Sequence, residues 1–342
     1  MRLNDVDVDY ERLTQAMQNA TKIIYNRVPK CGSSTMQVVV RRISRKIGTF
    51  ALKTSEIYDN ERPNAKELQR FVERLKSARA PWLYDRHLHF IEFDRYNLSN
   101  VLYINVVRRP VDRFFSEYYF HRFEHRKDMS KTRRHRTFED CVKKRYSECS
   151  KLSAFQKGSV PYFCGQSEFC MEPSQAAVDR AKANINKYYG VVGLTEDIMH
   201  TFALLEQTSP NIFRNMTLFA SDVIINNKRS MQATRRYVKD PAAMAIMNER
   251  MTYENQLYEF IKKRFYAFLV HFKTNAFLSG QLAHLQTMAD EQKKRELAAR
   301  VKVARKRLEK EKQKLKRERK KLMKEKSQLH KRVRELSTNN AR

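Results

Sequence analysis

Short apolar runs that are rich in β-branched and aromatic residues predict strands along the chain. Three of these runs cover residues 22–28, 101–107 and 189–194, and a fourth covers residues 88–93. The run at 101–107 reads VLYINVV, which is almost continuously apolar. A run of this kind is typical of a central parallel strand that is buried on both faces.

Apolar residues at helical spacing lie between and after these runs. They predict helices over 34–47, from Pro63, from Pro110, over 176–188, through Leu205, and over 242–272 as one long helix or a helix pair. Proline suits the first turn of a helix, where no hydrogen bond to its nitrogen is needed. Strands that alternate with helices predict an α/β fold with a central parallel sheet flanked by helices.

The pattern changes at both ends of the chain. Residues 1–20 are a polar lead-in, and the main domain is predicted over 21–275. From 290 to 337 there is no Gly or Pro, and leucine recurs every seven residues from Leu308 to Leu336. The companion positions are charged, whereas a stable zipper needs both apolar positions of each heptad. This segment predicts a long basic helix with weak coiled-coil character.

The charge of the chain narrows the classes of partner. The 342 residues carry a formal net charge of +31, and hydrophobic residues make up 41%. Residues 291–340 hold 21 Lys and Arg against seven Asp and Glu, so the remainder is also strongly basic. Such a balance favours polyanions as partners: nucleic acid, an anionic membrane or a sulfated polysaccharide.

The five cysteines fall into two close pairs and one single residue. Cys141 and Cys149 form one pair, Cys164 and Cys170 the other, and Cys31 stands alone. Four cysteines allow three pairings, which sequence alone does not decide. Two local disulfides suit an oxidising compartment, and a zinc site is the alternative.

The sequence has candidate glycosylation sites, as secreted proteins do, but no recognisable signal peptide or membrane span. Three Asn-x-Ser/Thr sequons, at Asn19, Asn97 and Asn215, are candidate glycosylation sites. No run of about 18 apolar residues predicts a membrane span. Residues 1–20 do not resemble a signal peptide, so disulfides would require a targeting segment that this sequence does not contain.

A phosphate-binding loop is predicted at residues 27–35, RVPKCGSST, between the first strand and the first helix. A helix N-terminus presents unpaired N–H groups to a phosphate, Gly32 permits close approach, and Lys30 adds a charge. Ser33, Ser34 and Thr35 add hydroxyl donors. The loop is not a Walker A loop, in which the lysine follows the second glycine. The alternative is that Ser33 or Ser34 only caps the helix.

A second candidate site is the basic run after residue 125. It contains Arg126, Lys127, Lys131, Arg133, Arg134 and Arg136. Arginine binds carboxylates and sulfates with two parallel hydrogen bonds, so Arg133, Arg134 and Arg136 are candidate ligands of an anionic polysaccharide. The alternative is a solvated loop.

Several separated motifs together resemble the heparan sulfate and uronyl 2-O-sulfotransferase family. They are YNRVPK at 25–30, GSST at 32–35, VLYINVVRRP at 101–110, RFFS at 113–116, PYFCG at 161–165 and VGLTE at 192–196. The likeness extends from about residue 22 to about residue 270. KCGS at 30–33 and RHLHF at 86–90 are closer to the uronyl branch.

The resemblance implies a P-loop-like sulfotransferase fold and transfer of a sulfuryl group from 3′-phosphoadenosine 5′-phosphosulfate (PAPS). The acceptor would be the 2-hydroxyl of iduronic or glucuronic acid in dermatan or chondroitin sulfate, or alternatively in heparan sulfate. His87 would be the base, with His89 in reserve, and Lys30 would neutralise charge on the leaving phosphate. The PAPS ligands would be Arg27, Lys30, Gly32, Ser33, Ser34, Thr35, Arg108 and Ser116, with Arg235 and Arg236 as weaker candidates.

The resemblance also implies a glycosaminoglycan partner, a homotrimer, and a type II membrane protein of the Golgi lumen whose anchor is absent from this sequence. It implies the disulfides Cys141–Cys149 and Cys164–Cys170, and no metal. His87 as an ordinary histidine and Arg108 as an ion-pair residue are the alternatives at those positions. A nucleic-acid-binding protein is the alternative of another class. However, no aromatic stacking platform accompanies the basic helix, so we expect no nucleic-acid partner.

Overall fold

The computed structural model describes residues 9–54, 60–125, 130–226, 237 and 239–281, together with residues 283 and 287. The chain divides into two units, Met1–Gln281 and Leu282–Arg342. The predicted basic helix at 290–337, the start of the lead-in, and Arg126, Lys127, Arg235 and Arg236 lie outside the described residues.

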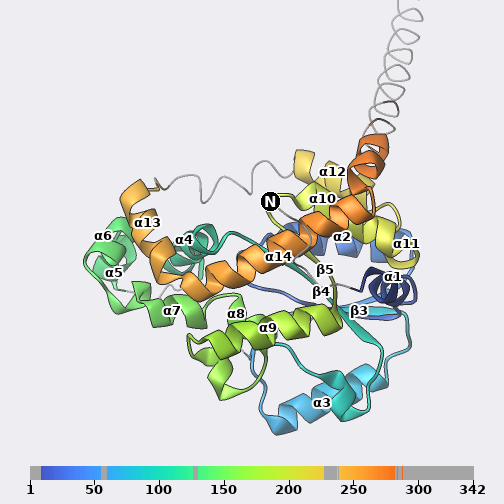
Figure 1. Ribbon diagram of the computed structural model, residues 1–342, viewed down its shortest axis with the longest axis horizontal. Helices are drawn as coiled ribbons and strands as arrows, with labels where there is room; N and C mark the ends of the chain where they lie inside the picture. The colour runs from blue at the N-terminus through green and yellow to red at the C-terminus, as the bar shows by residue number, and fades with distance from the viewer. Residues whose placement is uncertain are drawn as a thin grey trace, which may run out of the picture. The chain divides into compact units, whose positions relative to one another are not determined.

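Five parallel strands form one sheet in the order β2-β3-β1-β4-β5, as Figure 1 shows in part. The strands are β1 (Lys22–Asn26), β2 (Ala51–Thr54), β3 (Trp82–Arg86), β4 (Val101–Val107) and β5 (Tyr189–Leu194). The interior position of β4 agrees with its almost continuously apolar sequence. The predicted parallel α/β fold is therefore confirmed.

The strand predicted at 88–93 is wrong, because the strand of this region is β3, which ends at Arg86. Leu88, Phe90 and Ile91 are buried, but their segment is irregular. The backbone N–H of Phe90 donates to the carbonyl of Tyr162 at 2.8 Å and not to a neighbouring strand. An apolar run indicates burial, and it does not say which backbone groups will pair.

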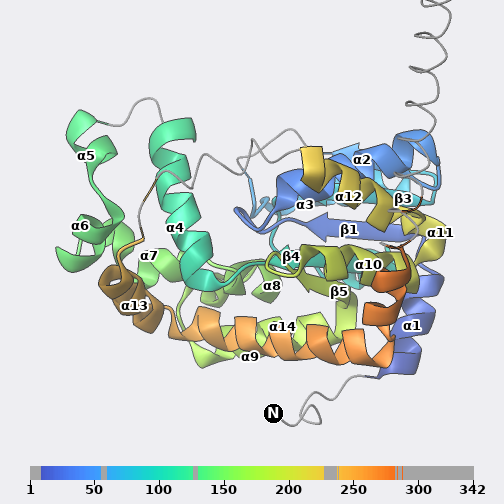
Figure 2. The ribbon, with the colours of Figure 1, turned by 90° about the horizontal axis from the view of Figure 1, so that it is seen from above.

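Helices cover both faces of the sheet (Figure 2). Helices α9 (Gln175–Tyr188) and α14 (Thr252–His271) lie side by side along one face. On the other face α2 (Ser33–Lys46) packs against α12 (Met216–Asn226), and α10 (Ile198–Thr208) packs against the edge strand β5. The remaining helices around the sheet are α1 (Tyr10–Gln18), α3 (Ala65–Lys76), α8 (Val160–Cys164) and α11 (Pro210–Phe213).

Helix α1 lies within the predicted polar lead-in, and its two apolar residues explain why it folds. Leu13 and Met17 are buried in the main core, four residues apart on one helical face. Asp9 caps the helix by accepting the N–H of Arg12 at 2.9 Å. The folded unit therefore includes the lead-in from Asp9 onward.

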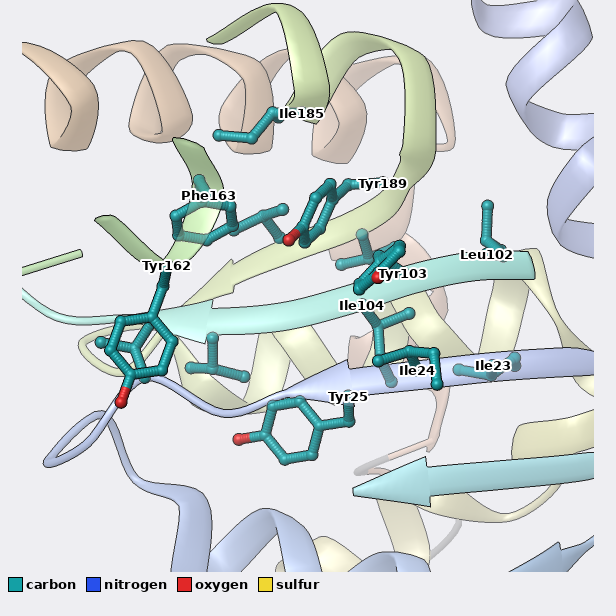
Figure 3. Packing of buried hydrophobic residues seen from close by; sticks show 14 of the residues in the cluster. Ile23, Ile24, Tyr25, Leu102, Tyr103, Ile104, Tyr162, Phe163, Ile185 and Tyr189 are labelled. Carbon is teal, nitrogen blue, oxygen red and sulfur yellow. The ribbon is translucent and has the colours of Figure 1, made fainter. Parts of the chain in front are cut away.

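Aromatic side chains fill the core between the sheet and α9. Figure 3 shows Tyr103 of β4, Tyr189 of β5 and Phe163 of α8 gathered in this layer. The rings of Tyr103 and Tyr189 are 4.9 Å apart, and the Tyr103 hydroxyl donates to the carbonyl of Ile91 at 2.8 Å. That hydrogen bond fixes the segment between β3 and β4 against the sheet.

A second apolar cluster extends from the carboxyl end of the sheet. It joins α4 (Pro110–Phe120), α6 (Phe138–Lys143) and α13 (Pro241–Arg250) through residues such as Phe115, Phe138 and Met247. Helices α5 (Lys131–His135) and α7 (Lys151–Gln156) lie beside it in Figure 2. Within the described residues, no helix is long and apolar enough to cross a membrane.

Candidate active site

The candidate site lies at the carboxyl edge of the sheet, where β1 and β4 are neighbours. The chain leaves β1 toward β3 and β2, whereas it leaves β4 toward β5, so the strand order reverses at this point. Open α/β sheets bind ligands at such a reversal. The loop after β1 and the turn after β4 both begin at this edge, and they contain most of the predicted donor ligands.

Gly32 shapes the phosphate-binding loop. It is the N-cap of α2 with a φ of 75°, and no side chain caps the helix. The alternative in which Ser33 or Ser34 is the cap is therefore wrong. A Cβ at Gly32 would lie 3.5 Å from Cγ2 of Thr195, which follows β5, and a side chain would strain the backbone at this φ. The loop thus needs glycine at this position.

The other loop residues are held from neighbouring elements. The backbone N–H of Arg27 donates to the carbonyl of Arg86 at 2.8 Å, and the Arg27 side chain is buried. Nζ of Lys30 lies 3.7 Å from the ring centroid of Phe120, at the end of α4. Ser33 and Thr35 are half-buried and Ser34 is exposed at the first turn of α2. The hydroxyl residues of the predicted donor loop therefore lie together at the first turn of α2.

His87 lies directly after β3 and contacts this loop. Its Nδ1 is 2.8 Å from the carbonyl oxygen of Arg27. Because a carbonyl only accepts, Nδ1 carries the proton and Nε2 is the acceptor nitrogen. Burial, followed by the charge of Arg27, lowers the pKa of His87 to about 4. The imidazole is therefore neutral at physiological pH, as a base must be.

His89, the reserve candidate, is more deeply enclosed. It is 1% exposed against 9% for His87. Its Nε2 lies 3.8 Å from Oε2 of Glu61, and its ring is 4.8 Å from that of Tyr162. Burial lowers the pKa of His89 to about 4 as well. Because His89 is almost fully enclosed by its neighbours, His87 remains our candidate base.

Arg108 and Ser116 take different positions near the turn after β4. Arg108 is half-buried, and its charge acts on the thiol of Cys31 within the donor loop. Burial raises the pKa of that thiol to about 12, so Cys31 is a neutral packing residue. Ser116 is 4% exposed on α4, two turns from Arg108. The structure brings Arg108 to the loop, and it buries Ser116 within α4.

A buried ion pair next to the loop, between Arg113 and Glu117, was not predicted from the sequence. Nη1 of Arg113 lies 2.6 Å from Oε2 of Glu117, and both side chains are buried on α4. The same Nη1 is 3.5 Å from the carbonyl of Pro29, while Nε and Nη2 have no partner among the described residues. Only the four-residue spacing of Arg113 and Glu117 could have indicated this pair.

Two of the three candidate acceptor arginines meet at one carboxylate. Arg133 and Arg136 each lie 3.1 Å from Glu148, and Arg122 of the same cluster also pairs with it. Arg134 is half-buried in the same short helix, α5. Arg122 and Arg133 line a small pocket together with Phe114, Glu117, Tyr118, His121, Glu148 and Lys157, whereas Arg134 and Arg136 are not among its lining residues.

Both cysteine pairs form disulfides, Cys141–Cys149 and Cys164–Cys170, and Cys31 is free. The zinc alternative is therefore wrong for these four residues. The described part of the chain has no cluster of three His, Cys, Asp or Glu side chains that could hold a metal ion.

Comparison with known proteins identifies the class. The sulfotransferase family matches residues 15–261, so the chain belongs to that family. It is 34% identical over 257 residues to the uronyl 2-sulfotransferases of Homo sapiens and Mus musculus, which covers 72% of this chain. It is 30% identical over 251 residues to heparan sulfate 2-O-sulfotransferase 1 of Xenopus laevis, covering 71% of this chain and 70% of that protein.

The resemblance read from the motifs is thus confirmed, including the greater likeness to the uronyl branch. The match covers 63% of the human and 62% of the mouse uronyl 2-sulfotransferase. This chain therefore spans less than two thirds of the length of those relatives.

Proposed function

We propose that this chain is a PAPS-dependent sulfotransferase that modifies the 2-hydroxyl of a uronic acid in dermatan or chondroitin sulfate. The contact between His87 Nδ1 and the Arg27 carbonyl carries the proposal. This contact supports His87 as a neutral base, with Nε2 as its acceptor nitrogen, next to the loop that would bind the activated sulfate. The greater identity to uronyl than to heparan sulfate enzymes favours this acceptor.

The donor fits the residues that are present. The sulfotransferase family implies PAPS, which supplies a sulfuryl group bonded to a good leaving phosphate. Lys30, Gly32, Ser33, Ser34 and Thr35 would hold the 5′-phosphosulfate at the uncapped start of α2. The buried Nε of Arg27, which has no partner in the described structure, is consistent with an anion at this loop. Arg108 and Ser116 would hold the 3′-phosphate.

The side chains then have separate tasks in the transfer. Nε2 of His87 accepts the proton of the sugar hydroxyl as its oxygen attacks sulfur. Lys30 offsets the charge that grows on the leaving phosphate. Arg133, Arg134 and Arg136 would hold the carboxylate or sulfate groups of the polysaccharide. The cluster of Arg122, Arg133 and Arg136 against one glutamate leaves positive charge for this purpose.

The setting of the enzyme follows from the same proposal. Two disulfides suit the Golgi lumen, an oxidising compartment in which polysaccharides are modified. The homotrimer and the membrane anchor implied by the resemblance stay predictions.

Incubation with radiolabelled PAPS and a panel of desulfated chains tests the proposal. Label should enter the 2-position of uronic acid in dermatan or chondroitin, as disaccharide analysis would show. Transfer to heparan alone would assign the other branch of the family. No transfer to any chain by a preparation that binds adenosine 3′,5′-bisphosphate would refute the enzymatic function.

A further inference from the structure

The carboxylate of Glu117 connects two sides of the candidate site. Its Oε2 is 2.6 Å from Nη1 of Arg113, and its Oε1 is 3.4 Å from Nε2 of His121. The three residues are spaced by four, so they lie on one face of α4 and its continuation. Glu117 is 6% exposed and Arg113 is fully buried. One enclosed carboxylate therefore contacts both Arg113 and His121.

Arg113 contacts both Glu117 and the loop proposed to bind the donor. Its Nη1 lies 3.5 Å from the carbonyl of Pro29, and its charge acts on the thiol of Cys31. Both of these residues belong to the predicted phosphate-binding loop. The guanidinium thus lies directly behind the loop, where its orientation depends on Glu117.

His121 contacts Glu117 and lines the pocket proposed to bind the acceptor. It begins the π-helical turn η3 (His121–His125), a rare element that is frequent at functional sites. His121 and Glu117 line the polar pocket together with Arg122, Arg133 and Lys157. Glu117 therefore contacts the proposed donor loop through Arg113, and it also lines the pocket proposed for the acceptor.

Glu117 is ionised throughout the working pH range. Burial alone would raise its pKa, but the charge of Arg113 and the hydrogen bond from His121 outweigh burial and lower the pKa to about 2. Its charge in turn acts on His87, where it favours the protonated imidazole. The other charged groups that face it from packed elements are Lys157, Glu61 and Glu254.

We propose that Glu117 is a positioning residue for sulfuryl transfer, which aligns Arg113 with the donor loop and aligns His121 with the acceptor pocket. The inference rests on the proposed function. As the acceptor oxygen bonds to sulfur, its proton moves to Nε2 of His87. The bond from sulfur to the bridging phosphate oxygen breaks, and its electron pair stays on the phosphate.

A matched control exists elsewhere in the fold. Glu206 of α10 is also a buried carboxylate, 8% exposed, and it accepts the N–H groups of Asn215 and Thr217 at 2.9 Å each. It caps the start of α12, far from the residues that we assign to either substrate. Glu206→Gln therefore reports the general cost of neutralising a buried carboxylate.

The experiment compares Glu117→Gln with Glu206→Gln in turnover and in calorimetric binding of adenosine 3′,5′-bisphosphate. We expect Glu117→Gln to lower kcat by about ten- to a hundredfold, because Arg113 and His121 lose the carboxylate that positions them. Its nucleotide Kd should stay within about threefold or become tighter, because a negative charge behind the anion site has been removed. Folded Glu206→Gln should keep both quantities within about threefold of the parent.

Two outcomes would overturn the inference: kcat within about threefold of the parent, or parallel losses in kcat and nucleotide binding, which indicate a merely structural role. If Glu117→Gln does not fold because Arg113 loses its partner, Arg113→Met/Glu117→Gln removes both charges. That double variant should still turn over slowly, and recovery of parental kcat would also overturn the inference. An inactive parent would refute the proposed function itself, which separates the two failures.

Discussion

The imidazole of His87 donates its Nδ1 proton to the carbonyl of Arg27, 2.8 Å away. Arg27 in turn donates its backbone N–H to the carbonyl of Arg86 at 2.8 Å. The candidate base and the start of the donor loop are thus held together by one side-chain and one backbone hydrogen bond at the ends of β1 and β3. A change at either residue will affect the geometry of the other.

Replacing His87 with alanine should remove nearly all transfer and leave nucleotide binding within about threefold, because positioned bases contribute roughly 10²–10⁴-fold to the rate. Radiolabel transfer and calorimetry measure the two effects. His271→Ala is the control, since His271 stacks on Tyr10 at the far end of α14. Turnover of His87→Ala within about tenfold of the parent would remove His87 from the mechanism and direct attention to His89.

The pH dependence of the reaction offers a separate test of the same base. Burial and Arg27 lower the pKa of His87 to about 4, so the base is unprotonated well below neutrality. We therefore expect kcat/KM to be nearly constant between about pH 6 and pH 8, and to fall only as the pH approaches 4. A fall centred near pH 6.5, the ordinary histidine value, would show that the base is a solvated histidine.

Replacing Arg108 with alanine should weaken adenosine 3′,5′-bisphosphate far more than adenosine 5′-phosphate. A charge-assisted contact of this kind is worth about 1.5–3 kcal/mol, or roughly ten- to a hundredfold in Kd. Arg109→Ala is the matched control, because Arg109 is exposed and pairs with Asp112 at 3.4 Å. Equal weakening of both nucleotides by Arg108→Ala would show that Arg108 does not recognise the 3′-phosphate.

The parts of the fold that could be predicted are those where one local pattern determines the structure. Strands β4 and β5 are continuous apolar runs, and the start of α2 is indicated by its glycine and hydroxyl residues. Strand β3 ends in Asp85 and Arg86, buried polar residues that its sequence pattern does not explain. Strand β2 is a half-exposed edge with no clear alternation.

The site was predictable only where its residues are consecutive. The donor loop and Arg108 lie in compact motifs next to strands, and their meeting follows from the parallel sheet. By contrast, Tyr162 hydrogen bonds to Glu61, a contact across 101 residues that no spacing indicates. The grouping of three arginines around Glu148 likewise depends on tertiary packing.

Glu254 predicts a pH-dependent term in stability. Its carboxylate accepts the N–H groups of Ser159 and Val160 at the start of α8, and burial raises its pKa from 4.5 to about 7. A carboxyl group whose pKa is raised by folding stabilises the protein below its unfolded pKa, and this contribution is lost as pH rises through the folded pKa. The window therefore extends from about pH 4.5 to about pH 7.

Urea unfolding of the parent and of Glu254→Gln at several pH values measures this term. The parent should lose stability relative to the variant as pH rises through the window, by an amount of the order of 3 kcal/mol. His87 and His89 titrate in both proteins, so their contributions cancel in the difference. A difference that does not change between pH 5 and pH 8 would contradict the raised pKa.

The Cys141–Cys149 disulfide should matter for acceptor binding more than for donor binding. Glu148 is the residue before Cys149, and it holds Arg122, Arg133 and Arg136. Cys141→Ser/Cys149→Ser should lower the free energy of unfolding by about 2–3 kcal/mol, because the unfolded chain gains conformational entropy when the crosslink is removed. It should also raise KM for the polysaccharide about three- to tenfold, because Glu148 is then less firmly placed.

The second disulfide provides the comparison that isolates this effect. Cys164–Cys170 closes a loop of similar length, and it follows α8, away from Glu148. Cys164→Ser/Cys170→Ser should cost similar stability but should not raise KM for the polysaccharide by the same factor. Equal increases in KM for the two double variants would show that lower stability, and not the arginine cluster at Glu148, accounts for the weaker acceptor binding.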